Sequence, residues 1–199
     1  GSDSDRPRMS NLSQSQIVLE QKLEGQLAGA IERGEIAIAL QPQIKTQSGQ
    51  LIGAEALARW DHPEFGMLGA ATLFSVAERA ELMPVLSSHI HDRALALGAN
   101  WPSSLSFLRL SINVTAGDLA KKTFVEDMKR KIAKSGFSAD CTTLEITETE
   151  LISDMTGSVE KLALLRAAGL RIAIDDFGTG YSSLAYLKEL PLDYLKIDS

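Results

Sequence analysis

Short apolar runs alternate with segments of helical periodicity over most of the chain. The apolar runs, some continuous and some alternating with polar residues, predict strands at 36–41, 51–60, 107–114, 143–147, 171–175 and 194–197. Apolar residues recurring near helical spacing predict helices at 14–33, 72–80, 84–100, 124–135, 157–168 and 182–189. Strands that alternate with helices in this way indicate βαβ units and a mainly parallel sheet.

Polar residues at the strand ends distinguish the two folds that this pattern allows. A doubly wound open sheet concentrates its functional groups at one switch point, whereas a (β/α)₈ barrel brings all its strand ends to one mouth. Five predicted strands carry polar residues at or near their ends, namely Glu55, Asn113, Glu145, the pair Asp175 and Asp176, and Lys196. This favours a TIM-like α/β barrel. Such a barrel usually needs about 250 residues, so we expect its last elements to be absent from this chain.

The stretch 51–60, LIGAEALARW, combines a predicted strand with charged side chains. Alternate side chains of a strand share a face, so Glu55, Leu57 and Arg59 are predicted to point the same way. Burying either charge unpaired costs several kcal/mol. Two interpretations satisfy this constraint, an internal ion pair between Glu55 and Arg59 or a ligand site, and the segment alone leaves both open.

Composition and charge narrow the class of protein. A hydrophobic content of 44% with 23% charged residues is ordinary for a soluble globular domain. The net charge of -6 argues against a long nucleic acid as partner, because such partners are held by basic surfaces. No apolar run approaches the roughly 20 residues of a membrane-spanning helix, so no membrane contact is expected. Residues 1–13 are expected to be a disordered leader or tag remnant, and the single cysteine, Cys141, allows a reducing compartment.

The predicted strand ends offer oxygen ligands only. Glu55, Asn113, Glu145 and Asp175 carry carboxylate or amide oxygens, with no His or Cys at a comparable position. Oxygen-only sites suit hard cations such as Mg²⁺, Mn²⁺ or Ca²⁺, and the like charges would repel one another strongly without a cation. Asp176 adds a carboxylate for a second ion, and two ions about 3.5 to 4 Å apart are usual in phosphodiester hydrolysis.

Basic and glycine residues extend this hypothesis. Lys196 would supply a positive charge to the attacking water or to a phosphate, and Arg59 a bidentate fork for a phosphate. The segment 176–183, DFGTGYSS, has two glycines that allow the backbone close approach to a ligand, although a tight turn is the plainer interpretation. Packing or solvated roles are expected for the three histidines, His62, His89 and His91.

Five motifs follow one another along the chain. They are Glu55-Ala56-Leu57 with Arg59-Trp60, the strand of Asn113, Glu145-Ile146-Thr147-Glu148, Asp175-Asp176-Phe177-Gly178-Thr179-Gly180, and Lys196-Ile197-Asp198. Together they resemble the EAL domain family of cyclic di-GMP phosphodiesterases, from about Leu23 to the last residue. The resemblance implies a TIM-like barrel with one antiparallel strand. It also implies hydrolysis of cyclic di-GMP to linear 5′-pGpG, with two ions of Mg²⁺ or Mn²⁺.

The resemblance further implies a role for each matching residue. Metal binding is implied for Glu55, Asn113, Glu145, Asp175 and, at the second ion, Asp176. Catalytic roles are implied for Glu55, Asp175 and Lys196. Substrate contacts are implied for Gln41, Leu57 and Arg59. Glu148 corresponds to a glutamate that steadies the loop after Asp176, and in the family that loop contributes to a dimer contact.

The chain departs from the family pattern at two places. Ala70 stands where the family usually has proline, which should affect a loop rather than catalysis. A further metal-coordinating glutamate and a late glutamine of the family fall beyond Ser199, so residues 14–199 are expected to form one EAL domain that is incomplete at its C-terminus. A cytoplasmic location, a homodimer and an upstream regulatory domain are also expected.

Two other functions remain as alternatives. A catalytically inactive EAL-type domain would bind cyclic di-GMP as a sensor, but inactive members typically lose metal-site residues that this chain retains. An enolase-like barrel with a lysine base would use similar ligands, and the order of the motifs argues against it.

Overall fold

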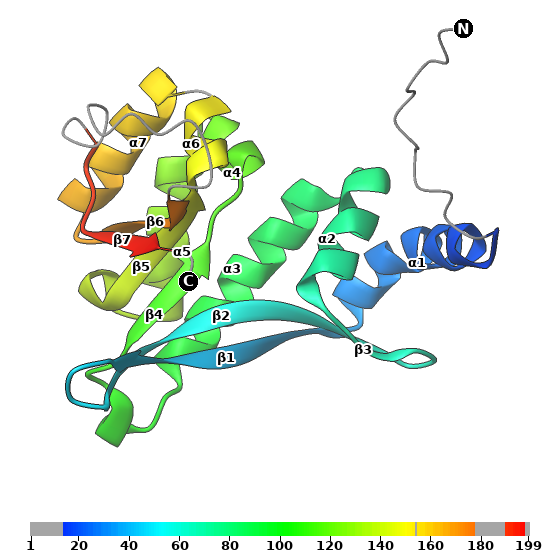
Figure 1. The fold of residues 1–199 in the computed structure, drawn as a ribbon, viewed down its shortest axis with the longest axis horizontal. Helices are drawn as coiled ribbons and strands as arrows, with labels where there is room; N and C mark the ends of the chain where they lie inside the picture. The colour runs from blue at the N-terminus through cyan, green and yellow to red at the C-terminus, as the bar shows by residue number, and fades with distance from the viewer. Residues whose placement is uncertain (1–13, 154, 178–189, 198–199) are drawn as a thin grey trace, which may run out of the picture.

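The structure is a computed structural model that describes residues 14–153, 155–177 and 190–197 (Figure 1). Its helices are α1 (Gln14–Glu32), α2 (Ala70–Arg79), α3 (Met83–Ala99), α4 (Ala116–Ala120), α5 (Phe124–Ser135), α6 (Glu148–Ser153) and α7 (Met155–Ala167). Its strands are β1 (Ile36–Lys45), β2 (Gln50–His62), β3 (Gly66–Leu68), β4 (Arg109–Asn113), β5 (Thr142–Thr147), β6 (Arg171–Phe177) and β7 (Tyr194–Ile197). Two short 3-10 turns, η1 (Ser103–Leu105) and η2 (Ala139–Cys141), precede β4 and β5.

The strands form one mixed sheet in the order β1-β2-β4-β5-β6-β7, with the short β3 paired to β2. β1 runs antiparallel to β2, whereas the pairs from β2 through β4, β5 and β6 to β7 are parallel. Within the described residues the sheet does not close, and β1 and β7 are its two ends. The fold is therefore a mixed α/β, TIM-barrel-like one, as predicted, and its first strand is the one antiparallel strand that the family resemblance implies.

Alternation along the parallel strands separates an apolar face from a polar one. In β4, Leu110 and Ile112 are fully buried in the core that packs against α3, α5 and α7. Ser111, on the opposite face, points towards Gln43 and Glu145. Because side chains of a strand alternate, one face can bury apolar residues under the helices while the other gathers polar groups.

A second core fixes the long strand β2 against the N-terminal helices. Ala54, Ala56, Ala58 and Trp60 alternate as buried residues along it, and Trp60 packs among α1, α2 and the start of α3. The indole Nε1–H of Trp60 donates to Glu35 Oε2 over 3.0 Å, so its polar edge is satisfied. The other face of the strand is left to Glu55, Leu57 and Arg59, which are half-buried, as the alternation predicts.

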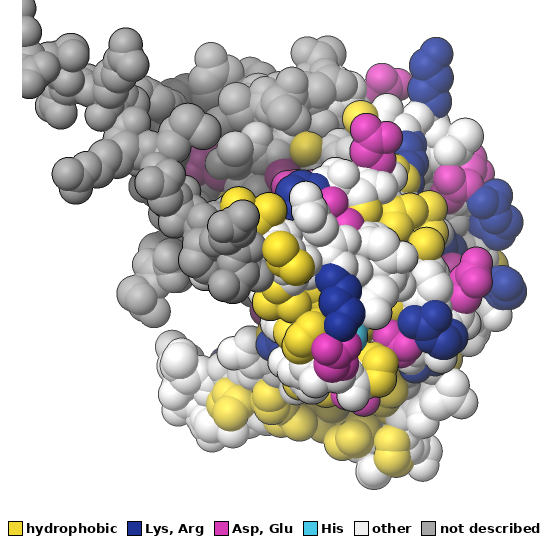
Figure 2. Space-filling view, turned by 90° about the vertical axis from the view of Figure 1, so that its right-hand side faces the viewer, with side chains coloured by type: hydrophobic (Ala, Val, Ile, Leu, Met, Phe, Trp, Pro, Cys, Tyr) yellow, Lys and Arg dark blue, Asp and Glu magenta, His cyan; other side chains and the backbone are white. Residues whose placement is uncertain are grey.

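Charges of both signs are mixed on the side of the molecule that carries α1 (Figure 2). Arg79 of α2 pairs with Glu20 and Glu24 of α1, and Lys22 pairs with Glu64 in the turn before β3. Exposed pairs of this kind contribute about 0–1 kcal/mol each. They join α1 to α2 and to the turn before β3, and they contribute little to the stability of the fold. No helix among the described residues is long and apolar enough to span a membrane.

Most predicted elements are present with small shifts of their ends. The bounds predicted for α5 and β7 match the structure, and β1 continues through Pro42 to Lys45 instead of ending at Gln41. Within the described residues β1 is an edge strand, the kind of strand in which proline is found. The sequence prediction missed β3, α4 and α6, which are all short. The predicted helix at 182–189 and the leader at 1–13 lie outside the described residues.

The packing of Trp60 leads to a prediction about stability. Trp60→Ala should lower the free energy of unfolding by about 3–5 kcal/mol, because Trp60 is fully buried in the core formed with α1, α2 and the start of α3. Denaturant titration followed by circular dichroism measures this loss. Phe107→Ala removes an aromatic ring that is 58% exposed, and should change stability by no more than about 0.5 kcal/mol. Equal losses in the two variants would contradict the assignment of Trp60 to the core.

Candidate active site and metal centre

The parallel register brings the predicted ligands to one edge of the sheet. Asn113 of β4 lies opposite Glu145 of β5, and Thr147 of β5 lies opposite Asp175 of β6. Glu55 of β2 lies opposite Ser111, and its side chain is within reach of Asn113. Neighbouring parallel strands therefore hold these side chains on the same face and at adjoining levels.

Three carboxylates converge at this edge. Ligand oxygens of Glu55, Glu145 and Asp175 all lie within 4.8 Å of one another. Glu145 is only 1% exposed, and the other two are half-buried. Like charges at this separation repel, and in a partly buried site water screens them weakly. A cation would relieve that repulsion, so the donor set fits a hard divalent ion.

The amide of Asn113 completes the oxygen donors. Its Nδ2 donates to Glu55 Oε1 over 3.1 Å, which directs the amide nitrogen to a carboxylate and leaves Oδ1 as the group that can accept or ligate. A cation coordinated by these residues would thus have carboxylate and carbonyl oxygens around it. This is the ligand chemistry that Mg²⁺ and Mn²⁺ prefer.

The backbone at the end of β6 is unusual. Asp176 has a φ of 55°, in the left-handed region that non-glycine residues rarely adopt, and its N–H donates to Asp175 Oδ1 over 3.1 Å. The β6–β7 register shifts between Ile174 and Phe177, as at a β-bulge. Bulges re-aim side chains and are frequent beside active sites. Asp176 is outside the described group of three converging carboxylates, so its service to a second ion stays a prediction.

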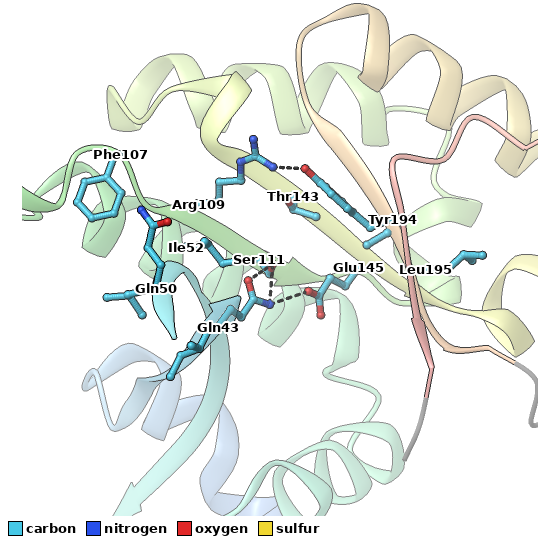
Figure 3. Close-up of a pocket in the computed structure, with 13 residues that line it drawn as sticks. Gln43, Gln50, Ile52, Phe107, Arg109, Ser111, Thr143, Glu145, Tyr194 and Leu195 are labelled. Carbon is cyan, nitrogen blue, oxygen red and sulfur yellow. Dashed lines mark hydrogen bonds between the residues drawn. The ribbon is translucent and has the colours of Figure 1, made fainter. Parts of the chain in front are cut away.

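Below the carboxylates lies Gln43 of β1, which the sequence prediction did not single out. Its Nε2 is 3.4 Å from Glu145 Oε1 and 3.3 Å from Ser111 Oγ (Figure 3). It lines a cavity of about 620 Å³ on the polar face of the sheet, together with Arg109, Thr143 and Tyr194. Gln41, the predicted substrate contact, lies two residues earlier on β1, where it is exposed and directly opposite Glu55. Because Gln41 and Gln43 are two residues apart on one strand, they share a face, and this spacing could have predicted that Gln43 also lies on the side of the site.

A second cavity of about 580 Å³ is lined by one of the candidate ligands, Asn113. Leu57, Phe74, Met83 and Ile90 give it an apolar wall, and Asn113 and Glu78 also line it. Arg59 lies two residues beyond Leu57 on β2, where its Nη1 donates to the carbonyl of Ala58 over 2.8 Å. Leu57, two residues beyond Glu55 on the same face of β2, therefore lines this cavity together with Asn113, which donates to Glu55.

The remaining predicted residues occupy the neighbouring elements. Lys196 lies on β7, the strand that pairs with β6. Glu148 begins α6 directly after β5 and is 6% exposed. The first turn of α6 is held by Glu150, whose Oε2 accepts from both the N–H and the hydroxyl of Thr147, each over 2.9 Å. The Thr-x-x-Glu spacing is a capping-box signal that could have predicted this helix.

Comparison with known proteins identifies the family. The sequence profile of the EAL domain matches residues 24–199, and the chain belongs to the EAL domain family. It is 38% identical over 161 residues to the cyclic di-GMP phosphodiesterase PA2567 of Pseudomonas aeruginosa, covering 81% of this chain and 27% of that protein. It is 34% identical over 180 residues to the cyclic di-GMP phosphodiesterase NbdA of the same organism, covering 90% of this chain and 23% of that protein. The chain thus spans less than a third of the length of these relatives.

Solved structures agree with this assignment. The PaMucR phosphodiesterase in complex with c-di-GMP superposes with a TM-score of 0.84 at 33% identity, covering 89% of this chain and 72% of that one. The EAL enzyme Bd1971, bound to cAMP and cyclic di-GMP, superposes with a TM-score of 0.82 at 27% identity, covering 94% of this chain and 51% of that one. The predicted TIM-barrel-like fold and family are therefore confirmed.

The convergence of carboxylates generates a prediction about stability and metal. Asp175→Asn keeps an acceptor for the N–H of Asp176 but removes one of three repelling charges. In EDTA its free energy of unfolding should therefore rise, on the order of 1 kcal/mol. In Mn²⁺ at 100 times its dissociation constant, the parent should gain about 2.7 kcal/mol, and the variant clearly less.

Thermal and denaturant unfolding with and without Mn²⁺ measure both effects. Asp61→Asn, at an exposed position on β2, serves as the matched control and should respond to Mn²⁺ like the parent. A loss of stability of Asp175→Asn in EDTA, with an undiminished response to Mn²⁺, would contradict the metal centre.

Proposed function

We propose that this domain hydrolyses cyclic di-GMP to linear 5′-pGpG with two divalent ions, Mg²⁺ or Mn²⁺. The observation that carries the proposal is the convergence of Glu55, Glu145 and Asp175, with Asn113 bonded to Glu55, at the edge where parallel strands end. The names of the relatives support the substrate, since NbdA is a cyclic di-GMP phosphodiesterase and the PaMucR phosphodiesterase was solved with c-di-GMP.

The proposed mechanism assigns the reacting groups to separate residues. Glu55, Asn113, Glu145 and Asp175 would hold one cation, and Asp176 would serve the second. Bound divalent ions lower the pKa of a water molecule and neutralise charge on a phosphoryl oxygen. Lys196 would place a positive charge beside the attacking water, where it favours the deprotonated form.

The substrate would lie across the mouth of the strands. Arg59 would bind a phosphate through its guanidinium fork, and Gln41, opposite Glu55, would contact the nucleotide. Leu57 would pack against a guanine base in the apolar cleft of about 580 Å³, a volume that suits a small-molecule ligand. Glu148, buried at the start of α6, would steady the loop that follows Asp176.

The proposal extends to the cellular setting of the domain. We place it in the cytoplasm, as a homodimer under the control of a regulatory domain in the same polypeptide. The length of the relatives supports such a domain, because the match to MucR, a bifunctional diguanylate cyclase and cyclic di-GMP phosphodiesterase, covers only 25% of that protein.

The reaction itself is the direct test. The full-length protein is incubated with cyclic di-GMP and Mn²⁺ or Mg²⁺, with EDTA as control, and linear dinucleotide is separated by chromatography. We expect 5′-pGpG to form only with metal. Binding of cyclic di-GMP without product would instead make the domain a sensor. The absence of both binding and product would contradict the proposal as a whole.

Replacing Glu55 tests the metal ligands separately from the fold. Glu55→Gln keeps the volume of the side chain and removes its charge, and should lower kcat by more than about 100-fold, because even indirect changes to metal sites cost 10–100-fold. Circular dichroism should remain unchanged. Glu32→Gln, the same substitution at an exposed position of α1, should leave turnover intact. Unaltered turnover of Glu55→Gln would remove this residue from the metal centre.

Replacing Arg59 tests phosphate recognition. Arg59→Ala should weaken binding of cyclic di-GMP by about 1–3 kcal/mol, the value of a hydrogen bond to a charged group. Arg59→Lys keeps the charge without the bidentate fork, so its affinity should fall between those of the parent and the alanine variant. Isothermal titration with Ca²⁺ in place of Mg²⁺ measures both. Parent-like affinity of Arg59→Ala would show that this side chain does not bind the phosphate.

A further inference from the structure

A buried polar cluster lies behind the candidate metal centre, on the helical side of β4. Ser87 and His91 come from α3, and Asp118 comes from α4, the short helix that follows β4. Their exposed fractions are only 5%, 3% and 3%. Buried polar groups require partners, and the partners of this cluster lead to Asn113.

Asp118 anchors the chain directly after β4. Its Oδ2 accepts from Ser87 Oγ over 2.6 Å, from Thr115 Oγ1 over 2.9 Å and from the Thr115 N–H over 3.0 Å. Lys121 Nζ lies 3.6 Å from Oδ1. The N–H of Asp118 donates in return to Thr115 Oγ1, which completes a capping box. Thr115, two residues beyond Asn113, is thereby fixed to α3 and α4 together.

His91 reaches Asn113 itself. Its Nε2 lies 3.1 Å from the backbone oxygen of Asn113, and a carbonyl oxygen only accepts, so Nε2 carries the proton of this hydrogen bond. Burial lowers the pKa of His91, which favours the neutral ring. Ser87 Oγ is farther from Nε2, at 3.5 Å, and gives its own proton to Asp118.

The peptide group between Asn113 and Val114 is consequently held at both ends. His91 binds its oxygen, and its N–H donates to the backbone oxygen of Glu145 over 2.9 Å. Glu145 is one of the three converging carboxylates, and the Asn113 side chain donates to Glu55, another of them. The orientation of this one peptide group is therefore coupled to three of the candidate ligands, Asn113, Glu145 and Glu55.

A nucleophilic role for the cluster is excluded by its connectivity. Serine, histidine and aspartate are the residue types of a hydrolytic triad, in which histidine accepts the proton of serine and aspartate orients histidine. Here Ser87 donates to Asp118 instead, and His91 Nε2 faces a backbone oxygen. The arrangement is suited to holding a backbone group in place.

We propose that His91 is a positioning residue for the metal centre, which it serves by fixing the carbonyl of Asn113 and so the direction of the Asn113 amide. The inference rests on the proposed function, because it assumes that Asn113 ligates a cation. Residues that orient metal ligands from behind typically contribute 10–100-fold to metal affinity or activity. His91 would act through the backbone of a ligand and touch neither substrate nor metal.

Mn²⁺ binding to the full-length protein, measured by electron paramagnetic resonance of the free ion, tests this inference without recourse to activity. His91→Leu removes the donor and should weaken Mn²⁺ binding about 10-fold. His91→Gln restores an N–H donor on a neutral side chain, and should bind Mn²⁺ within about threefold of the parent. His89→Leu is the matched control. It lies on the same helix, its Nε2 has no hydrogen-bond partner within the described part of the chain, and its affinity should equal that of the parent.

The outcomes separate this inference from the proposed function. No Mn²⁺ binding by the parent would overturn the proposed metal centre, and the inference with it. Binding by the parent and equally by a folded His91→Leu would overturn the positioning role alone. If His91→Leu does not fold, His91→Met is the second variant without a donor, and the same comparison applies. Weak binding by His91→Gln, equal to that of the leucine variant, would show that packing and not the hydrogen bond is at work.

Discussion

Repulsion among three carboxylates is the constraint around which this domain is built. Parallel strands in register hold Glu55, Glu145 and Asp175 within 4.8 Å of one another, and Glu145 is almost entirely buried. Carboxylates brought this close repel one another, while the opposite face of the same strands buries apolar side chains under α3, α5 and α7. The stabilising core and the charged site are two faces of one sheet, and strand alternation makes both possible.

The strand β2 shows how packing far from the site determines its geometry. Beyond Arg59 the strand is held by Trp60 and by His62, whose Nδ1 accepts the N–H groups of Glu64 and Phe65. His62 Nε2 lies 2.8 Å from Gln26 Oε1 on α1. A one-residue slip in β2 would turn every side chain to the other face. These contacts therefore keep Glu55, Leu57 and Arg59 on the polar side, and they connect α1 mechanically to the strand that carries the first candidate ligand.

Much of this fold could be predicted from local pattern alone. The alternation in 51–60 predicted the shared face of Glu55, Leu57 and Arg59, and the polar strand ends predicted that Glu55, Glu145 and Asp175 would meet. The short helices α4 and α6 were not predicted, because they are too short to show a hydrophobic period of their own. The Thr-x-x-Asp and Thr-x-x-Glu boxes at Thr115 and Thr147 specify their first turns instead.

Supporting residues of the site could not be predicted in the same way. Gln43 meets Glu145 across 102 positions of sequence, and His91 meets the backbone of Asn113 across 22. Such contacts depend on register and helix placement, which no local pattern contains. His91 was expected in a packing or solvated role, and its burial agrees with packing. Its hydrogen bond to the end of β4 depends on how α3 packs against β4, which the sequence pattern does not specify.

Anomalous diffraction from crystals of the full-length protein grown with Mn²⁺ tests the central claim most directly, because it locates the ion without reference to turnover. The account predicts an anomalous peak within coordinating distance of Glu55, Glu145 and Asp175, with the Asn113 amide oxygen turned towards it. A well-ordered Mn²⁺ found only elsewhere, with these carboxylates held by protein groups alone, would contradict it.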